Sequence, residues 1–141
     1  LAAEDLAAMG ARQVESLDAL LPQCDFVSLH CPGGPANRHL IDGPRLDRMR
    51  EGAFLVNTAS DDLVDSHALT QALMFETIGG AAIDVIGGGA RLPAMLLDCD
   101  HLVVTPHLAA ATREAQEAMG FRVLDNLEDF FAGRAPRDRV M

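Results

Sequence analysis

The chain has 141 residues, 49% of them hydrophobic, and a formal net charge of −10 at pH 7. This length suffices for one ordinary hydrophobic core, so we expect a single folded domain over residues 1–141. The excess of carboxylates argues against a nucleic-acid partner, and no apolar run approaches the roughly 18 residues of a membrane span.

The first part of the chain predicts two helices and two strands. Residues 4–10 (EDLAAMG) predict a short helix, and residues 10–14 (GARQV) a short edge strand. Ser16 is expected to cap a second helix that carries three leucines on one face. Residues 25–31 (DFVSLHC) then predict a buried strand, because the run is short and rich in apolar residues.

The middle of the chain predicts a strand, a helix and a second strand. The strands are residues 53–59 (AFLVNTA) and 81–86 (AAIDVI). Between them, Asp65 is expected to cap a helix over DSHALTQAL. The apolar face of this helix consists of Leu69, Ala72 and Leu73.

The last part predicts one strand and the longest helix. The strand is residues 101–107 (HLVVTPH). Thr112 is expected to cap the helix and Gly133 to end it. Gly120 inside the helix costs roughly 1 kcal/mol relative to Ala, which suggests close packing against a neighbour. Much of the expected buried stripe is supplied by Ala115, Met119, Leu124, Leu127 and Phe131.

Strands that alternate with helices at this spacing predict βαβ units and a parallel sheet covered on both faces, hence an α/β fold. Ligands of such sheets bind outside the carboxyl ends of the strands. The polar residues at the predicted ends therefore mark the expected site. They are His30, Cys31, Asn57, Thr58, Ser60, Asp61, Asp62, Asp84, Thr105 and His107.

Several familiar motifs are missing from the sequence. No G-x-G-x-x-G or P-loop follows a strand, and zinc-ligand spacing and a G-x-S-x-G elbow are absent. A metal cluster of Asp61, Asp62, Asp65 and His67 is a weaker interpretation than Asp65 as a helix cap, so no metal is expected. His107 is either a general acid/base or a strand-end histidine bonded to backbone.

The cysteines indicate the compartment. Cys24, Cys31 and Cys99 are odd in number and form no C-x-x-C pair, which favours a reduced, cytoplasmic location over a disulfide framework. No signal-peptide pattern occurs at the amino end. Because the chain begins at Leu1 rather than Met, we expect a fragment or a processed product.

Five strings in order and spacing resemble the D-isomer-specific 2-hydroxyacid dehydrogenase family, particularly its glyoxylate, hydroxypyruvate and glycerate dehydrogenase branch. They are DFVSLHCPGGPANRHLID, GAFLVNTA, DLVDSHAL, IGGAAIDV and VVTPHLAAATREAQEAMGFRVLDNLEDFFAG. The resemblance implies a half-Rossmann fold, the second half of an NAD(P)-binding domain whose glycine-rich loop precedes Leu1. It also implies hydride transfer between NAD(P)H and a 2-oxo acid such as glyoxylate or hydroxypyruvate.

The resemblance assigns roles to eight residues. It makes His107 the catalytic acid/base and places Asp84 near the nicotinamide carboxamide. The remaining assignments concern the cofactor. His30, Cys31 and Pro32 lie beside its adenosine half, Asn37 stands where the family often has a cofactor-contacting Thr, and Thr58 and Ala59 lie under the nicotinamide ribose.

Two departures from the family pattern predict impaired catalysis. Ser60 stands where the family has the arginine that binds the substrate carboxylate, and Asp61 and Asp62 follow it. Losing such a charged partner costs roughly 1.5–3 kcal/mol. Gly87 lies in the stretch where the family has the glutamate that orients the histidine. The alternative to an impaired dehydrogenase is a non-catalytic remnant, or engineered half-domain, that self-associates.

The expected partner is a second copy of the chain. The strand at 25–31 would neighbour the family's first strand, so its edge would be unpaired and would favour pairing across a two-fold axis or swapping. The last helix is the second candidate interface. For the rings of Phe121, Phe130 and Phe131 in this helix, a position in the core is expected in preference to a position in an interface.

Overall fold

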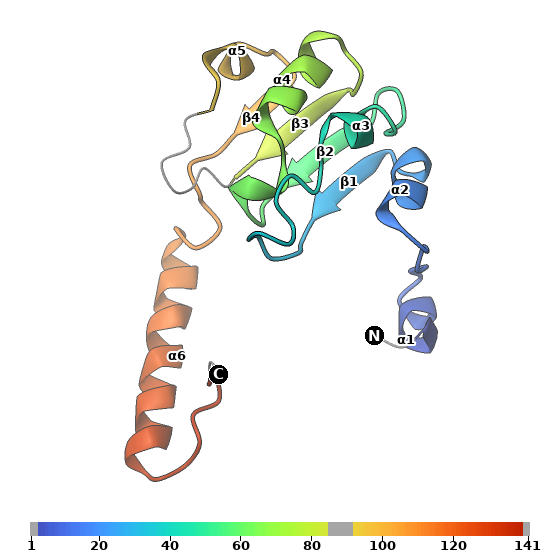
Figure 1. Ribbon diagram of the computed structural model, residues 1–141. Coiled ribbons are helices and arrows are strands. Elements are labelled where there is room, and N and C mark those ends of the chain that lie inside the picture. Colours follow the sequence, from blue (N-terminus) through green and yellow to red (C-terminus); the bar gives the residue numbers. More distant parts are fainter. Residues whose placement is uncertain (1–2, 85–91, 140–141) are drawn as a thin grey trace. The chain divides into compact units, whose positions relative to one another are not determined.

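The computed structural model describes residues 3–84 and 92–139 (Figure 1). The chain divides into two units, Leu1–Pro106 and His107–Met141. The single domain predicted over residues 1–141 stays a prediction. None of the described helices is long and apolar enough to cross a membrane.

The first unit contains a four-stranded parallel sheet in the order β1-β2-β3-β4 (Figure 1). The register aligns Leu29, Asn57, Ile83 and Val104, so the carboxyl ends of all four strands meet at one edge. The predicted parallel sheet and α/β class are confirmed. The strands are β1 (Phe26–Leu29), β2 (Phe54–Asn57), β3 (Gly80–Ile83) and β4 (Leu102–Val104).

Local capping sets the start of the helices. Ser16 Oγ accepts a hydrogen bond from Ala19 N at 3.1 Å, and Asp65 Oδ1 accepts from His67 N and Ala68 N at 2.9 and 3.1 Å. Both predicted caps are confirmed, as is the first helix. The helical segments of this unit are α1 (Ala3–Ala8), α2 (Leu17–Leu20), η1 (Leu21–Gln23), α3 (Gly43–Leu46), η2 (Asp61–Leu63), α4 (Ser66–Met74) and α5 (Ala94–Leu97).

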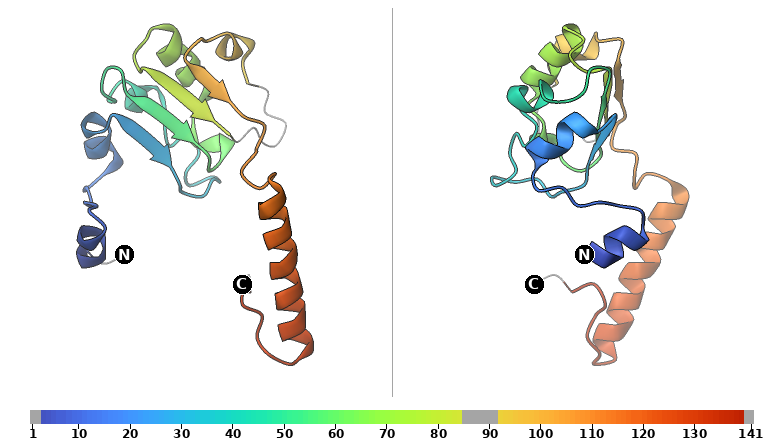
Figure 2. Two further views of the ribbon diagram at one scale, coloured as in Figure 1. Left: turned by 180° about the vertical axis from the view of Figure 1, so that it is seen from behind. Right: turned by 90° about the vertical axis from the view of Figure 1, so that its right-hand side faces the viewer.

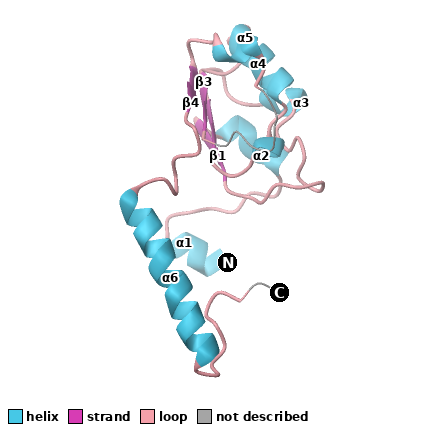
Figure 3. Cartoon of the chain, turned by 90° about the vertical axis from the view of Figure 1, so that its left-hand side faces the viewer, coloured by secondary structure: helices cyan, strands magenta, loops and turns pink. Residues whose placement is uncertain are grey.

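Two sequence predictions fail in this unit. Residues 11–14 belong to no strand, so the predicted edge strand at 10–14 is wrong. The segments α2 to α5 cover one face of the sheet (Figures 2 and 3). On the other face, Phe26 is 69% and Phe54 42% exposed, with their rings stacked at 5.4 Å. The predicted cover on both faces is therefore wrong for the described part of the first unit.

The hydrophobic core lies between the sheet and these helices. Val27 and Leu29 of β1 are both 5% exposed, in alternation with exposed neighbours, because successive side chains of a strand point to opposite faces. The most deeply buried apolar side chains are Leu21, Ile41, Leu46, Leu55, Leu63, Leu69, Ile78 and Leu96. This core fixes the strand ends that carry the candidate site.

The second unit is α6 (Arg113–Phe131) with a short tail. Thr112 Oγ1 accepts from Ala115 N at 3.1 Å, and Gly133 follows the helix with φ +71°, so both predicted ends are confirmed. The tail folds back along the polar side of the helix. Asp138 accepts hydrogen bonds from Arg122 and Asn126, and these bonds lower the pKa of Asp138 to about 2.

The apolar face of α6 is exposed rather than buried. Of the predicted stripe, only Ala115 is half-buried, and the other four side chains are exposed. Phe121, Phe130 and Phe131 are exposed as well, so their predicted core position is wrong. Asp129, bonded to Arg134, is the buried residue of this helix. Helical periodicity identifies an apolar face but does not say what covers it.

Gly120 also differs from its prediction, because a Cβ built there would meet nothing within 4 Å. We therefore expect Gly120→Ala to stabilise α6 by about 0.5–1 kcal/mol, since alanine loses less backbone entropy in a helix. Thermal unfolding followed by circular dichroism measures the change. Gly52→Ala is the matched control: its Cβ also has open space, but its φ of +77° makes that substitution destabilising. A destabilised Gly120→Ala protein would contradict the expectation.

Candidate functional site

The end of β2 is built around Asn57, which is 1% exposed. Its Nδ2 donates to the Ser60 carbonyl at 2.7 Å, and its Oδ1 accepts from Ala59 N and Ser60 N at 3.1 and 3.3 Å. The side chain thus closes the loop that presents Thr58, which is exposed. The sequence predicted Asn57 at a strand end, but it did not predict this structural role.

Asp62 joins the loop after β2 to the loop after β1. Its Oδ1 accepts from Ser60 Oγ at 2.7 Å, and its Oδ2 accepts from Gly34 N at 2.6 Å. Its backbone carbonyl accepts from His39 N at 2.7 Å. A Cβ at Gly33 would collide with Ser60 and Asp62, so the two loops touch where only glycine fits. Asp62 is therefore a structural carboxylate, which the sequence did not reveal.

These contacts also fix the charge of Asp62. The hydrogen bond from Ser60 is the main cause that lowers the pKa of Asp62, followed by the bond from Gly34 N and the charge of Arg38. At neutral pH an ionised carboxylate therefore stands beside Ser60. This arrangement opposes the binding of a second anion at the position where a substrate carboxylate was expected to bind.

We expect Asp62→Asn to destabilise the protein at neutral pH, because the variant loses the charged acceptor of both hydrogen bonds. The pKa of Asp62 is lowered in the folded state, so its contribution is fully present above about 3.8 and disappears as the pH falls through the folded-state value. Urea unfolding at pH 7 and at about pH 3 measures this. The difference between the two proteins should shrink at the lower pH. Asp61→Asn is the control, because Asp61 makes neither bond; a pH-independent difference would refute the assignment.

The loop after β1 is held by its own side chains. Asn37 Nδ2 donates to the Pro32 carbonyl at 2.8 Å, which closes the turn between these residues. His30 Nε2 lies 2.9 Å from Ser28 Oγ, and Cys31 is half-buried. His30, Cys31 and Pro32, predicted to lie beside the adenosine half of a cofactor, and Asn37, predicted at the position of a cofactor-contacting Thr, therefore belong to one ordered loop.

The ends of β3 and β4 carry a hydrogen-bonded pair. Thr105 Oγ1 donates to Asp84 Oδ1 at 2.5 Å, and Asp84 N donates to the Asn57 carbonyl at 3.0 Å. Both side chains are half-buried. Asp84 is thus oriented by Thr105. The sequence predicted Thr105 at a strand end, but it did not predict this contact.

His107 begins the second unit, three residues after the end of β4. Its side chain is exposed, and its φ of +55° lies in the left-handed region, which is uncommon for a residue with a side chain. Gly87, which was predicted to stand in place of the glutamate that orients the histidine, lies outside the described residues. The sequence prediction for His107 stays a prediction.

The polar groups at this edge fit one part of a dinucleotide. Carboxylate and amide oxygens at Asp84 and Asn37 can accept hydrogen bonds from a carboxamide or from ribose hydroxyls. The first N–H groups of α4, which could otherwise bind a phosphate, are occupied by Asp65. Among the described residues, no group of three or more His, Cys, Asp or Glu side chains is placed to hold a metal ion.

Residues 2–109 match the family model described as "D-isomer specific 2-hydroxyacid dehydrogenase, NAD binding domain". A glycerate dehydrogenase from Methylorubrum extorquens is 40% identical over 121 residues, which cover 84% of this chain and 38% of that protein. The chain therefore spans well under half the length of this relative.

Solved structures agree with this match. The D-mandelate dehydrogenase of Rhodotorula graminis superposes with a TM-score of 0.87 at 28% identity, covering 100% of this chain and 42% of that one. A glyoxylate reductase from Paecilomyes thermophila superposes with a TM-score of 0.79 at 34% identity, covering 86% and 37%. The predicted resemblance is confirmed.

Proposed function

We propose a function from the premise that this chain belongs to the D-isomer specific 2-hydroxyacid dehydrogenase family, within its NAD-binding domain. The chain supplies the nicotinamide side of an NAD(P) site, in a protein that interconverts a 2-oxo acid such as glyoxylate or hydroxypyruvate and its 2-hydroxy acid. The observation that carries the proposal is the carboxyl edge of the sheet, where Asn57, Asp84 and Thr105 form one hydrogen-bonded group.

Each predicted site residue has a role in this proposal. Asp84, oriented by Thr105, accepts a hydrogen bond from the nicotinamide carboxamide. His107 gives its proton to the carbonyl oxygen of the 2-oxo acid. The bound nicotinamide supplies the hydride. The remaining contacts come from Thr58 and Ala59 to the nicotinamide ribose, and from His30, Cys31, Pro32 and Asn37 to the adenosine half.

We further propose that the chain alone is a poor dehydrogenase. Ser60 has no charge for a substrate carboxylate, and its hydroxyl is already bonded to Asp62. The ionised Asp62 repels an anionic substrate. Gly87 stands where the family has the glutamate that orients the histidine, so His107 lacks that carboxylate partner.

The second proposed role is self-association through β1. This strand pairs only with β2 among the described strands, and it stands at the end of the sheet order. An unpaired strand edge favours pairing with a second copy across a two-fold axis. A strictly monomeric chain in light scattering would contradict this role. The three free thiols support a reduced, cytoplasmic location.

The cofactor assignment is tested with Asp84→Ala. We expect the variant to bind NADH about tenfold or more weakly, because a hydrogen bond to a charged group is worth about 1.5–3 kcal/mol. Fluorescence titration measures the affinity, and circular dichroism checks the fold. Asp47→Ala, an exposed carboxylate on another surface, is the control. Equal affinity of the Asp84 and Asp47 variants would remove the support for this site.

A further inference from the structure

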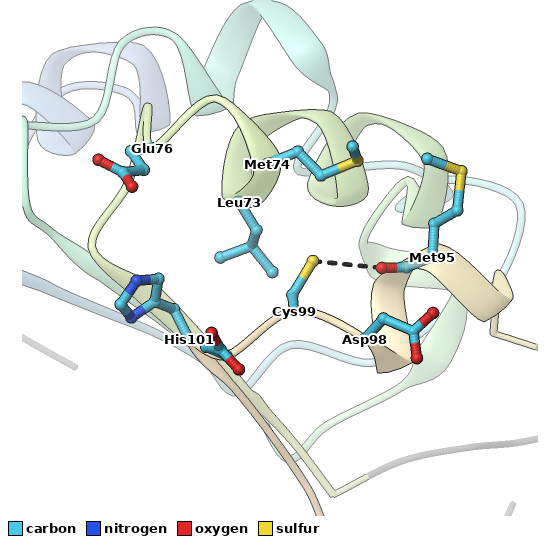
Figure 4. Close-up of a pocket in the computed structure, with 8 residues that line it drawn as sticks. Leu73, Met74, Glu76, Met95, Asp98, Cys99 and His101 are labelled. Carbon is cyan, nitrogen blue, oxygen red and sulfur yellow. Dashed lines mark hydrogen bonds between the residues drawn. The ribbon is translucent and has the colours of Figure 1, made fainter.

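A cavity of about 370 Å³ lies at the opposite end of the sheet from the proposed cofactor site. It is formed by the end of α4, by α5, and by the segments that lead into β3 and β4 (Figure 4). The residues that line it are Leu73, Met74, Glu76, Met95, Asp98, Cys99, Asp100 and His101. Nothing in the proposed dehydrogenase function uses this cavity.

The cavity has an apolar lining that is open to solvent. Met74 is 52% and Met95 57% exposed, while Leu73 is 4% exposed. Figure 4 shows the side chains of these residues and of Cys99 around the same space. Flexible methionine side chains adapt to different apolar partners and are frequent at binding surfaces. Phe75, directly after α4, and Leu97 of α5 are exposed apolar side chains as well.

The thiol of Cys99 contributes to the lining rather than to chemistry. It donates a hydrogen bond to the Met95 carbonyl at 3.3 Å. This bond ties Cys99 to α5 beside the cavity. The lining is therefore held by local contacts of α5, and the two methionine side chains remain available to a partner.

The rim of the cavity is acidic. Glu76, Asp98 and Asp100 are exposed carboxylates, and the lining residues that the structure describes include no Lys or Arg. Glu76 and Asp98 lie on different sides of the space in Figure 4. Such a rim favours a cationic occupant. It also disfavours a second copy of this chain, because the chain carries a formal net charge of −10.

We propose that this cavity is a docking site for a basic segment of a partner protein. A large apolar side chain of the partner inserts between Met74 and Met95, and Lys or Arg residues beside it meet Glu76, Asp98 and Asp100. The cavity volume is in the range of known binding pockets, and a central apolar anchor inside a polar rim is the usual anatomy of a protein interface. The proposal is independent of the dehydrogenase function.

The test uses the full chain and three fluorescent model peptides of equal length. The first places Leu and Lys at helical spacing, the second replaces Leu by Ser, and the third replaces Lys by Glu. We expect saturable binding of the Leu/Lys peptide alone, weakened by added salt. Binding of either other peptide with similar affinity would overturn the proposal, because the site requires both the anchor and the positive charge.

Two pairs of variants locate the binding. The double variant Met74→Gln/Met95→Gln is expected to weaken the Leu/Lys peptide by about tenfold or more, and Met119→Gln, an equally exposed methionine on α6, should leave it unchanged. Asp98→Asn/Asp100→Asn should also weaken binding by about tenfold, whereas Asp47→Asn/Glu51→Asn should not. These are surface substitutions, so the fold is expected to persist, and circular dichroism checks it. Unchanged affinity of the cavity variants would refute the site.

Discussion

Reduction of glyoxylate with NADH by this chain is expected to be at least about a thousandfold less efficient, as kcat/KM, than by a family member that keeps the arginine and the glutamate. Losing a charged partner of the substrate costs roughly 1.5–3 kcal/mol, which is about 10- to 150-fold in rate. Losing the carboxylate that orients a catalytic histidine costs roughly 10⁴-fold in a serine protease. The expected thousandfold loss of kcat/KM is a lower bound, and it is smaller than the product of these two losses.

Loss of NADH absorbance measures this rate, with the glyoxylate reductase of Paecilomyes thermophila as the positive control. Ser60→Arg alone should not restore turnover, because the new guanidinium would pair with Asp62, whose carboxylate lies 2.7 Å from Ser60 Oγ in the native loop. Turnover within tenfold of the control enzyme, by either protein, would show that the chain does not depend on these two groups.

Replacing Leu69 by alanine is expected to lower the free energy of unfolding by about 2–5 kcal/mol. Leu69 is 0% exposed on the face of α4 that packs against the sheet, and its truncation leaves a cavity that the surrounding core fills only partly. The loss would act on the site as well, because α4 begins directly after the loop of Ser60 and Asp62.

Urea unfolding measures this loss, with Met74→Ala as the matched control on the same helix. Met74 is 52% exposed, so its truncation should change the free energy of unfolding by less than about 1 kcal/mol. Equal losses for the two variants would mean that α4 does not hold the core in the way that the burial of Leu69 indicates.

The helix caps and strands were predictable because their signals are local. Ser16, Asp65 and Thr112 each accept a hydrogen bond from an N–H three residues ahead, so residue type and spacing suffice to find them. The strands appear as short apolar runs. The segments α3 and α5 have four residues each, too few for a periodic pattern to appear.

The contacts that build the candidate site were not predictable in the same way. Asp62 bonds to Gly34 across 28 residues, and Thr105 bonds to Asp84 across 21. Each bond forms because parallel strands place their ends side by side. The sequence alone does not show which strand ends become neighbours. An aspartate in a loop is equally typical of a solvated turn, so the structural role of Asp62 appears only in the fold.

The sequence also does not predict which apolar surfaces other elements cover. Phe26 and Phe54 look like core residues in the sequence, and so does the apolar stripe of α6, but these side chains are exposed, except for the half-buried Ala115. Apolar patterning says that a surface is suited to burial. What covers it is a property of the neighbouring elements.

The most direct test of the proposed function is a titration of the purified chain with NADH, followed by fluorescence or calorimetry, with glyoxylate then added to the complex. We predict saturable binding weaker than micromolar, because the carboxyl edge offers partners for the nicotinamide side while Asp65 occupies the N–H groups at the start of α4. No saturable binding up to millimolar NADH would contradict the account, and would leave a family fold without its cofactor.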